Sequence, residues 1–201
     1  MAIKHDMSKA YDKVKCNFLK GMLAKLGFSK WINLVIRCIY LVTYSVCING
    51  NVYGNIKPSR GLRQDDPLSP FLFFFTQKVC LICCVELKKK GNISGFKCSK
   101  GGPVISHLYF IDDSLVFTKA NEKNCAAIKT ILEVYVKASG QVINYDKSSM
   151  SISPSNSNAL GDRLASLIGI RKVDCHKKYL GLTCFYGRNK RALFSNIIDR
   201  V

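Results

Sequence analysis

Acidic residues are scarce in this sequence: 13 Asp and Glu stand against 31 Lys and Arg, a formal net charge of +18. A smaller excess would be an ordinary basic surface, but this one favours a polyanionic partner, most simply nucleic acid. Polar residues do not dominate either. Hydrophobic residues make up 48% of the 201, too much for general disorder and enough for one domain, or one domain with an appendage.

Paired cysteine motifs are missing, although the chain has ten cysteines. Cys80, Cys83 and Cys84 fall in one apolar run, and no second cluster downstream completes the four ligands of a zinc site. We therefore expect no zinc site. Most cysteines should be small, reduced core residues, which fits an intracellular compartment.

A secretory signal and a long uninterrupted apolar run are missing too. The N-terminus, MAIKHDMSKAYD, is polar, so we expect a protein of the nucleus or cytoplasm that is not secreted. The most apolar stretch, PFLFFFTQKVCLICCVEL, is interrupted by Gln77 and Lys78. This favours a buried helix over a membrane span.

Helices and hairpins alternate irregularly along the chain. Apolar periodicity predicts helices over 13–26, 71–88 and 122–139, a helix capped by Ser29, and one around Leu160–Ile168. Asn49-Gly50 predicts a tight hairpin, residues 104–118 a second one, and Val142–Asn144 a short strand. No internal repeat or long linker divides the chain. The mixture indicates an α+β fold with an antiparallel sheet.

Two adjacent aspartates, Asp112 and Asp113, lie at the tip of the second hairpin, in YFIDDSLVF. Their charges repel unless a cation neutralises them, and magnesium takes carboxylate oxygens. If the extended segment that ends at Asp6 pairs beside this hairpin, Asp6 and Asp112 converge. Two divalent ions, roughly 3.5–4 Å apart, then fit between them. From the residues alone, a solvated turn for the pair and a helix N-cap role for Asp6 stay open.

Five motifs occur in order: HDMSKAYDKV, PSRGLRQDDPLSPFLF, YFIDDSLVF, ASGQVINYDKSSM and KKYLGL. Together they resemble the reverse transcriptase of non-LTR retrotransposons (long interspersed elements), particularly the plant type, over nearly the whole chain. The resemblance implies a palm-like antiparallel sheet backed by helices. Residues 1–153 would be the catalytic core, and 154–201 the end of the palm with a turn that grips the primer.

The resemblance also implies the chemistry. An RNA-directed DNA polymerase uses two Mg²⁺ ions, with Mn²⁺ as an alternative, and takes an RNA template, a DNA primer and deoxynucleoside triphosphates. Asp6, the backbone carbonyl of Met7, Asp112 and Asp113 would bind the metal. Lys147 would lie near the pyrophosphate as a general acid.

Further residues follow from the same motifs. Tyr11 would stack under the incoming sugar and exclude a 2′-hydroxyl. The loop that contacts nucleotide and template would comprise Arg60, Gly61, Arg63 and Gln64, and the primer grip Tyr179, Leu180 and Gly181. Each has a simpler alternative: a core aromatic for Tyr11, solvated charges for the arginines and Lys147, and an ordinary turn glycine for Gly181.

The sequence departs from the family pattern at two positions. Asp65 replaces a glycine, which matters if that position needs a positive φ, and Ile111 replaces an alanine beside the metal pair. The chain begins near the first catalytic strand and ends just after the primer-grip match. We therefore expect fingers and thumb to be largely missing, with no endonuclease domain, and activity to be impaired. The alternative is a function without catalysis, that of a basic remnant that binds nucleic acid.

Overall fold

The structure is a computed structural model. It describes residues 1–89, 91, 93–97, 99–110, 113–176, 178–179 and 182–183. Ile111, Asp112, Leu180 and Gly181 therefore lie outside the described residues.

A five-stranded sheet lies at the centre of the fold. Its order is β6-β7-β1-β8-β9, from the strands β6 (His107–Phe110), β7 (Asp113–Phe117), β1 (Ala2–His5), β8 (Ser149–Ser151) and β9 (Arg171–Lys172). β1 pairs antiparallel with both β7 and β8, whereas β8 and β9 run parallel. The predicted α+β class is confirmed, with one parallel pair in an otherwise antiparallel sheet.

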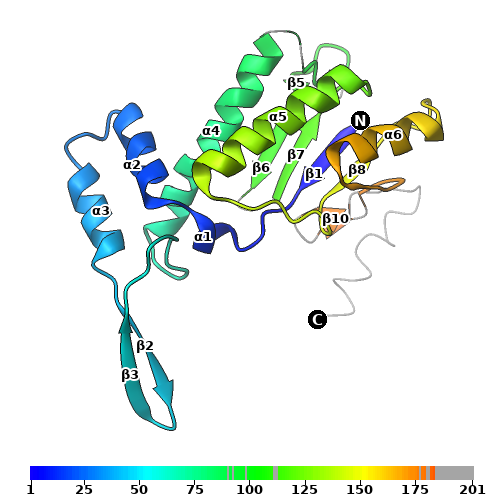
Figure 1. The fold of residues 1–201 in the computed structure, drawn as a ribbon. Coiled ribbons are helices and arrows are strands. Elements are labelled where there is room, and N and C mark those ends of the chain that lie inside the picture. Colours follow the sequence, from blue (N-terminus) through cyan, green and yellow to red (C-terminus); the bar gives the residue numbers. More distant parts are fainter. Residues whose placement is uncertain are drawn as a thin grey trace.

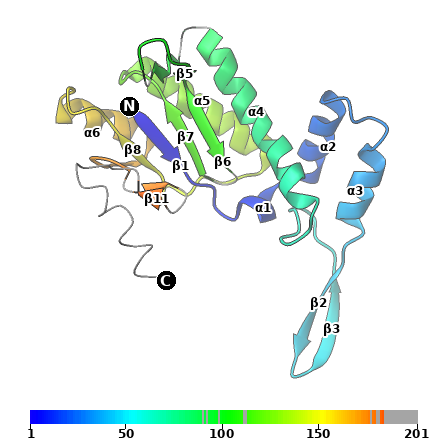
Figure 2. The same cartoon turned by 180° about the vertical axis from the view of Figure 1, so that it is seen from behind.

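Two long helices cover one face of the sheet. α4 (Ser69–Lys89) and α5 (Glu122–Ser139) lie in front of it in Figure 1 and behind it in Figure 2. Ile3, Val116 and Met150 are paired across three strands and are 0–2% exposed, so this row faces the helices. Burial of such side chains stabilises the fold by about 1.5–3 kcal/mol each. We call the other side of the sheet the open face.

The helix α5 was predicted with the correct bounds. Asn121 caps its start by accepting a hydrogen bond from the Asn124 N–H at 2.8 Å, and Gly140, in the left-handed conformation, ends it. Cys125, Ile128, Leu132 and Tyr135 form its buried stripe.

The helix α4 is apolar on more than its buried side. Leu72, Phe73 and Cys80 are buried, whereas Phe71 and Phe74 are 66% and 57% exposed. By length and composition alone α4 is long and apolar enough to span a membrane, with a mean hydropathy of 1.7. A third of that window is buried inside the fold, and the helix packs against α2, α5 and β6. A core helix of a soluble protein passes the same test, so no membrane argument follows.

The helix predicted over 13–26 is observed as α2 (Cys16–Lys25), which starts later, and a separate short helix, α1 (Ala10–Lys13), precedes it. The two helices are separated by Val14, whose backbone is extended. α3 (Ile32–Tyr40) has Trp31 at its N-cap with no side-chain cap, so the prediction that Ser29 caps it is wrong.

A two-stranded ribbon projects from the body of the molecule beyond α3 (Figure 1). It consists of β2 (Tyr44–Ile48) and β3 (Asn51–Ile56), and every residue in it is exposed. Asn49 and Gly50 have φ of 51° and 81°, the positive pair that a tight hairpin turn requires, which confirms this hairpin. Two smaller hairpins join β4 (Phe96–Lys97) to β5 (Val104–Ile105) and β10 (Lys178–Tyr179) to β11 (Leu182–Thr183).

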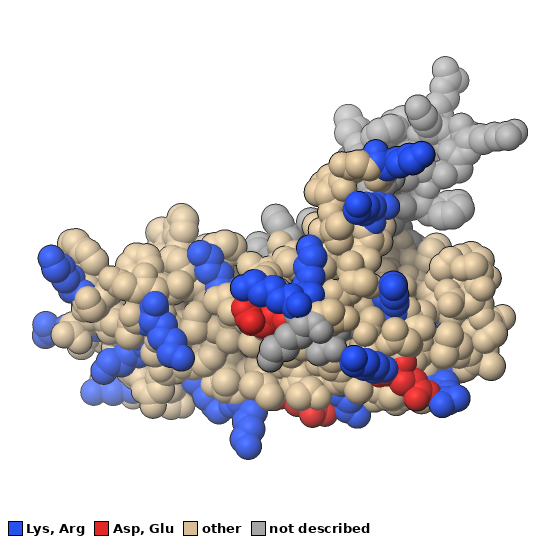
Figure 3. All heavy atoms as spheres, turned by 90° about the horizontal axis from the view of Figure 1, so that it is seen from above, with Lys and Arg blue, Asp and Glu red and all other residues tan. Residues whose placement is uncertain are grey.

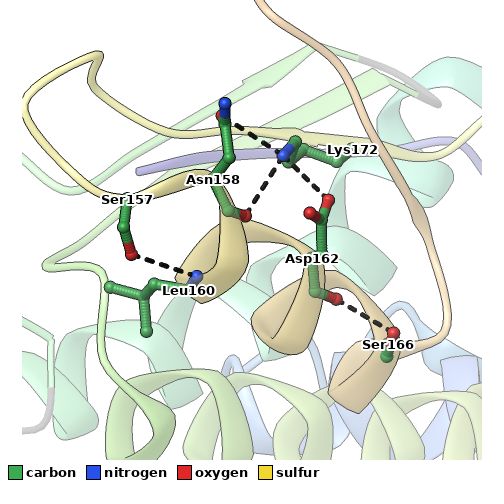
Figure 4. Close-up of polar contacts among 6 residues, drawn as sticks. All are labelled: Ser157, Asn158, Leu160, Asp162, Ser166 and Lys172. Atoms are coloured by element: carbon green, nitrogen blue, oxygen red, sulfur yellow. Dashed lines mark hydrogen bonds and ion pairs between the residues drawn. The ribbon is translucent and has the colours of Figure 1, made fainter.

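The helix α6 (Asn158–Ile168) is attached to the last strand of the sheet (Figure 4). Ser157 caps its start, and the ammonium of Lys172 lies 2.8 Å from an Asp162 carboxylate oxygen and donates to the Asn158 carbonyl at 3.2 Å. These contacts turn Lys172 toward the helix side of β9. The neighbouring Arg171 therefore faces the open side.

Candidate active site

The pairing of β1 with β7 brings two predicted aspartates together. The ladder ends with His5 opposite Ser114, so the next residue on each strand, Asp6 and Asp113, stands at the same end of the sheet. His5 and Ser114 are 1% and 5% exposed and belong to the helix side. Because strand residues alternate, Asp6 and Asp113 belong to the open face. Asp112, which precedes Asp113 in the sequence, lies outside the described residues.

One cation within the fold already lies against this end of the sheet. The Lys4 ammonium is 3.0 Å from an Asp113 carboxylate oxygen, and the two side chains are only 20% and 18% exposed. A pair of this kind is worth about 1 kcal/mol. This contact was not predicted from the sequence, because it depends on the register of β1 against β7.

Asp6 is attached to the turn that carries Lys147. Its backbone N–H donates to Ser148 Oγ at 3.2 Å, and its carbonyl accepts the Asn144 N–H at 2.9 Å. The Lys147 N–H donates to Asn144 Oδ1 at 3.2 Å in the same turn. The N-cap alternative for Asp6 is wrong, because α1 begins at Ala10 with Lys9 as its N-cap.

The segment 142–144 is not a strand. Ile143 forms a single antiparallel bridge with Met7, and the Ser8 N–H donates to the Val142 carbonyl at 2.8 Å. The strand beside β1 is β8, formed six residues later. Met7, whose carbonyl was predicted to bind metal, thus follows Asp6 along the same edge and is 5% exposed.

The predicted nucleotide loop is bound to α1, directly after Asp6. The Gly61 N–H donates to the Val14 carbonyl and the Leu62 N–H to the Tyr11 carbonyl, both at 2.8 Å. At Gly61, φ is 97° and an added Cβ would lie 2.9 Å from the Asp12 carbonyl oxygen. Only glycine fits this approach without a shift.

The same loop lines a cavity of about 230 Å³ between α1, α3 and α4. Arg60, Gly61 and Arg63 line it together with Asp12 and Asp66. The Gln64 side-chain amide donates to Asp12 Oδ1 at 3.5 Å. Four of the five residues predicted to contact nucleotide and template thus lie in the loop 60–64. This loop lies next to Asp12, which was not among the predicted site residues.

Asp65 has φ of 63°, in the left-handed region that a glycine adopts freely. The backbone at position 65 does have a positive φ. The replacement of the family's glycine by Asp65 therefore matters, as expected from the sequence. This conformation costs an aspartate up to about 1 kcal/mol, less than most side chains, because its short polar side chain tolerates the left-handed region.

The Tyr11 ring stacks on the Phe73 ring of α4, with centroids 4.7 Å apart and planes 18° from parallel. It is half-buried and packs against the hydrophobic core. The structure thus contains the core contact that was the alternative for Tyr11. It does not test the contact with a sugar.

Tyr179 ends β10, which pairs antiparallel with β11 through Tyr179 opposite Leu182. The predicted primer-grip residues Leu180 and Gly181 fall between these strands, outside the described residues.

Gln141 is a positioning residue that the sequence reading missed. It is 1% exposed, and its side-chain amide donates to the Ala10 carbonyl at 2.7 Å. At Gly140 an added Cβ would lie 2.8 Å from the Lys13 carbonyl. The pair holds α1 against the end of α5, and the signal for it was the motif ASGQVINYDKSSM, of which only Lys147 had been assigned.

The donor set fits a hard divalent cation. Asp6 and Asp113 offer carboxylate oxygens, and the Met7 carbonyl lies on the same edge; magnesium prefers such oxygen ligands. Among the described residues no three His, Cys, Asp or Glu side chains are grouped to hold a metal, but Asp112 is not one of them. The eight described cysteines are free thiols, and Cys16, Cys80, Cys84 and Cys125 are buried.

Comparison with known proteins decides the family. Residues 1–184 match the protein family described as reverse transcriptase (RNA-dependent DNA polymerase). The chain belongs to the reverse transcriptase family. The match covers all five motifs, so the reverse transcriptase family predicted from the sequence is confirmed. It does not test the non-LTR, plant type.

The chain is also similar to one curated protein in sequence and to one solved structure in fold. An uncharacterized mitochondrial protein of Arabidopsis thaliana is 42% identical over 78 residues, which are 35% of this chain and 64% of the relative. The structure of apo telomerase from Candida tropicalis, truncated from its C-terminal domain, has a TM-score of 0.59 at 18% identity. That alignment covers 78% of this chain and 31% of the telomerase chain, and at this identity it shows a shared fold.

Positive charge is spread over the face of the molecule that Figure 3 shows. Lys and Arg are distributed across the whole face in Figure 3, with Asp and Glu at only a few places. A surface of this kind attracts polyanions. It fits the nucleic-acid template that the family implies.

Proposed function

We propose that this chain is the palm region of an RNA-directed DNA polymerase of a non-LTR retrotransposon, which extends a DNA primer by two-metal nucleotidyl transfer. The pairing of β1 with β7, which puts Asp6 and Asp113 at one end of the open face, carries the proposal. Support comes from the family and from the five motifs in order. The matched parts span 64% and 31% of the two relatives, so the whole enzyme's activity is part of the proposal.

The proposed roles divide the site into two parts. Asp6, Asp112 and the Met7 carbonyl would hold the metal, with Asp113 as their neighbour. Two bound magnesium ions would activate the primer hydroxyl and stabilise the leaving pyrophosphate. Lys147, held in the Asn144–Ser148 turn beside Asp6, would give a proton to that leaving group.

The loop 60–64 would hold nucleotide and template. Its attachment to α1 at Tyr11 and Val14 keeps a constant separation between this loop and Asp6, four residues before α1. Positioning of this kind counts for as much as the metal, since a displacement of about 1 Å can lose 10²-fold in rate.

Asp65 favours a reduced activity. Its strained backbone and its negative charge stand in the loop where a triphosphate would pass. Ile111 adds a branched side chain beside Asp112. The alternative function is a basic module that binds nucleic acid without catalysis. Asp65 and the net charge of +18 support it.

Primer extension on an RNA template separates the two functions. We expect slow, metal-dependent addition of deoxynucleotides by the chain, faster addition by Asp65→Gly, and none by Asp112→Asn. A protein that binds the primer–template but shows no addition, even as Asp65→Gly with Mn²⁺, would establish the non-catalytic alternative.

A further inference from the structure

A large basic cavity opens on the open face of the sheet, next to the aspartates. Its volume is about 740 Å³, within the usual range for ligand sites. The residues that matter for its chemistry are Lys4, Lys147, Ser149, Arg171, Asp174 and His176. Of these, only Lys147 has been assigned a role above.

Three of the lining residues form one row across the sheet. Lys4 on β1 is paired with Ser149 on β8, and Ser149 is paired with Arg171 on β9. Paired residues of neighbouring strands project on the same side. The row therefore spans two strand spacings, about 9.5 Å, with a cation at each end. Lys147 comes two residues before Ser149, beyond the end of β8.

The charges in this cavity are not balanced. Three cations line it, and the described lining contains one carboxylate, the exposed Asp174. Lys4 lies against Asp113, but neither Lys147 nor Arg171 forms an ion pair with any residue that the structure describes. Cations gathered in this way repel one another until an anion neutralises them.

His176 forms a fixed wall of the cavity. Its Nε2 lies 3.3 Å from the Ala2 carbonyl, and its Nδ1 lies 3.3 Å from Ser149 Oγ. Because a carbonyl only accepts, Nε2 carries the proton and Ser149 donates to Nδ1. These bonds hold the segment after β9 over β1 and β8. Burial lowers the pKa of His176, so the ring is neutral at pH 7 and adds no charge to the three cations.

We propose that this cavity binds phosphate groups, with Lys4, Lys147 and Arg171 as the residues that hold them. The phosphates would come either from the pyrophosphate released at the aspartates or from the backbone of the primer strand. Both sources rest on the proposed function, and both present the same chemistry to the cavity. Lys4 connects the two sites, since it lines the cavity and lies against Asp113.

Binding measurements without catalysis test the proposal. Inorganic pyrophosphate is titrated into the whole chain by calorimetry, without divalent ions, and a labelled single-stranded oligonucleotide is followed by fluorescence anisotropy at fixed salt. The variants are Lys147→Gln and Arg171→Gln, which are both exposed and outside the described ion pairs. Lys123→Gln on α5, exposed on the helix side, is the matched control for the loss of one charge.

Each cavity variant should weaken binding of at least one probe by about tenfold, the usual effect of one charge-assisted contact, while Lys123→Gln changes it less than twofold. Arg171→Lys should restore most of the affinity and shows that the site needs the charge. A loss for pyrophosphate alone identifies the leaving group as the source, and a loss for the oligonucleotide alone identifies the primer strand.

Equal binding by Lys147→Gln, Arg171→Gln and Lys123→Gln would overturn the proposal. Thermal melting of each variant shows whether it is folded, and Lys147, in an exposed turn, provides the test even if Arg171→Gln is destabilised. Because no reaction is measured, the result is independent of primer extension. A failed polymerase assay with intact phosphate binding would contradict the proposed function and leave this cavity in place.

Discussion

Replacement of Gly61 by alanine is the most informative change in the nucleotide loop. The residue has φ of 97°, and its N–H donates to the Val14 carbonyl at 2.8 Å. An added Cβ would lie 2.9 Å from the main-chain oxygen of Asp12 and 3.1 Å from its Cα. These are backbone atoms of α1, so they cannot rotate away as a side chain would. Gly61→Ala must strain the loop or detach it.

Two costs add in this variant. An alanine in the left-handed region costs about 1–2 kcal/mol. The added Cβ would also push the loop away from Asp12. The loop would then lose its two hydrogen bonds to the Val14 and Tyr11 carbonyls, which are worth about 1 kcal/mol each. We expect a total of about 3 kcal/mol. Gly169→Ala is the control. Its φ is 85° and its Cβ would meet nothing nearer than 3.9 Å, so this variant has only the cost of the left-handed backbone.

Thermal melting and urea denaturation measure the difference. For a chain of this size 1 kcal/mol shifts Tm by about 2–4 °C, so Gly61→Ala should melt several degrees below Gly169→Ala. If the loop detaches while the core stays folded, the loss is seen instead as weaker primer–template binding, with Gly169→Ala unchanged. Equal Tm and equal binding for the two variants would refute the close approach of the loop to α1.

Three further changes follow from single residues of the site. Asp65→Gly should raise the free energy of unfolding by up to about 1 kcal/mol, because it relieves the strain at φ of 63°; an unchanged or lower value in urea denaturation would contradict this. Burial lowers the pKa of His5 to about 4, so the unfolded chain binds a proton that the folded chain does not between pH 6.5 and 4. Stability should therefore fall as the pH drops through this range, by about 2 kcal/mol at pH 5, and His5→Leu should abolish this loss; parallel curves for the two proteins would exclude it. Lys4→Met should raise the affinity for Mn²⁺ about fivefold in a calorimetric titration, because the ion no longer competes with an ammonium 3.0 Å from Asp113; an unchanged affinity would place the metal elsewhere.

The elements that local chemistry dictates could be predicted from the sequence. Asn49-Gly50 supplies both positive φ angles of its turn, and Asn121 and Gly140 mark the two ends of α5. The errors arose where tertiary contacts prevail. The helix predicted from residue 13 starts only at Cys16, because Val14 is extended and its carbonyl accepts the Gly61 N–H. Ile143 forms one bridge to Met7 in place of a strand.

In the candidate site, too, some features could be predicted from the sequence and others depend on tertiary contacts. The sequence led us to expect Asp6 near the second hairpin on the condition that its strand pairs beside that hairpin, and the pairing of β1 with β7 meets this condition. The contacts of Lys4 with Asp113 and of Gln141 with Ala10 join residues more than a hundred positions apart. They depend on strand register and on the placement of α1, which no local pattern encodes.

The central claim is that Asp6 and Asp112 hold divalent metal on the open face of the sheet. Crystals of the chain soaked in Mn²⁺ test it directly through anomalous difference density. The account predicts manganese bound by carboxylate oxygens of both residues, at the end of β1 and β7, and no such density in Asp112→Asn. Carboxyl groups of Asp6 and Asp112 on opposite faces of the sheet, with no manganese between them, would contradict it.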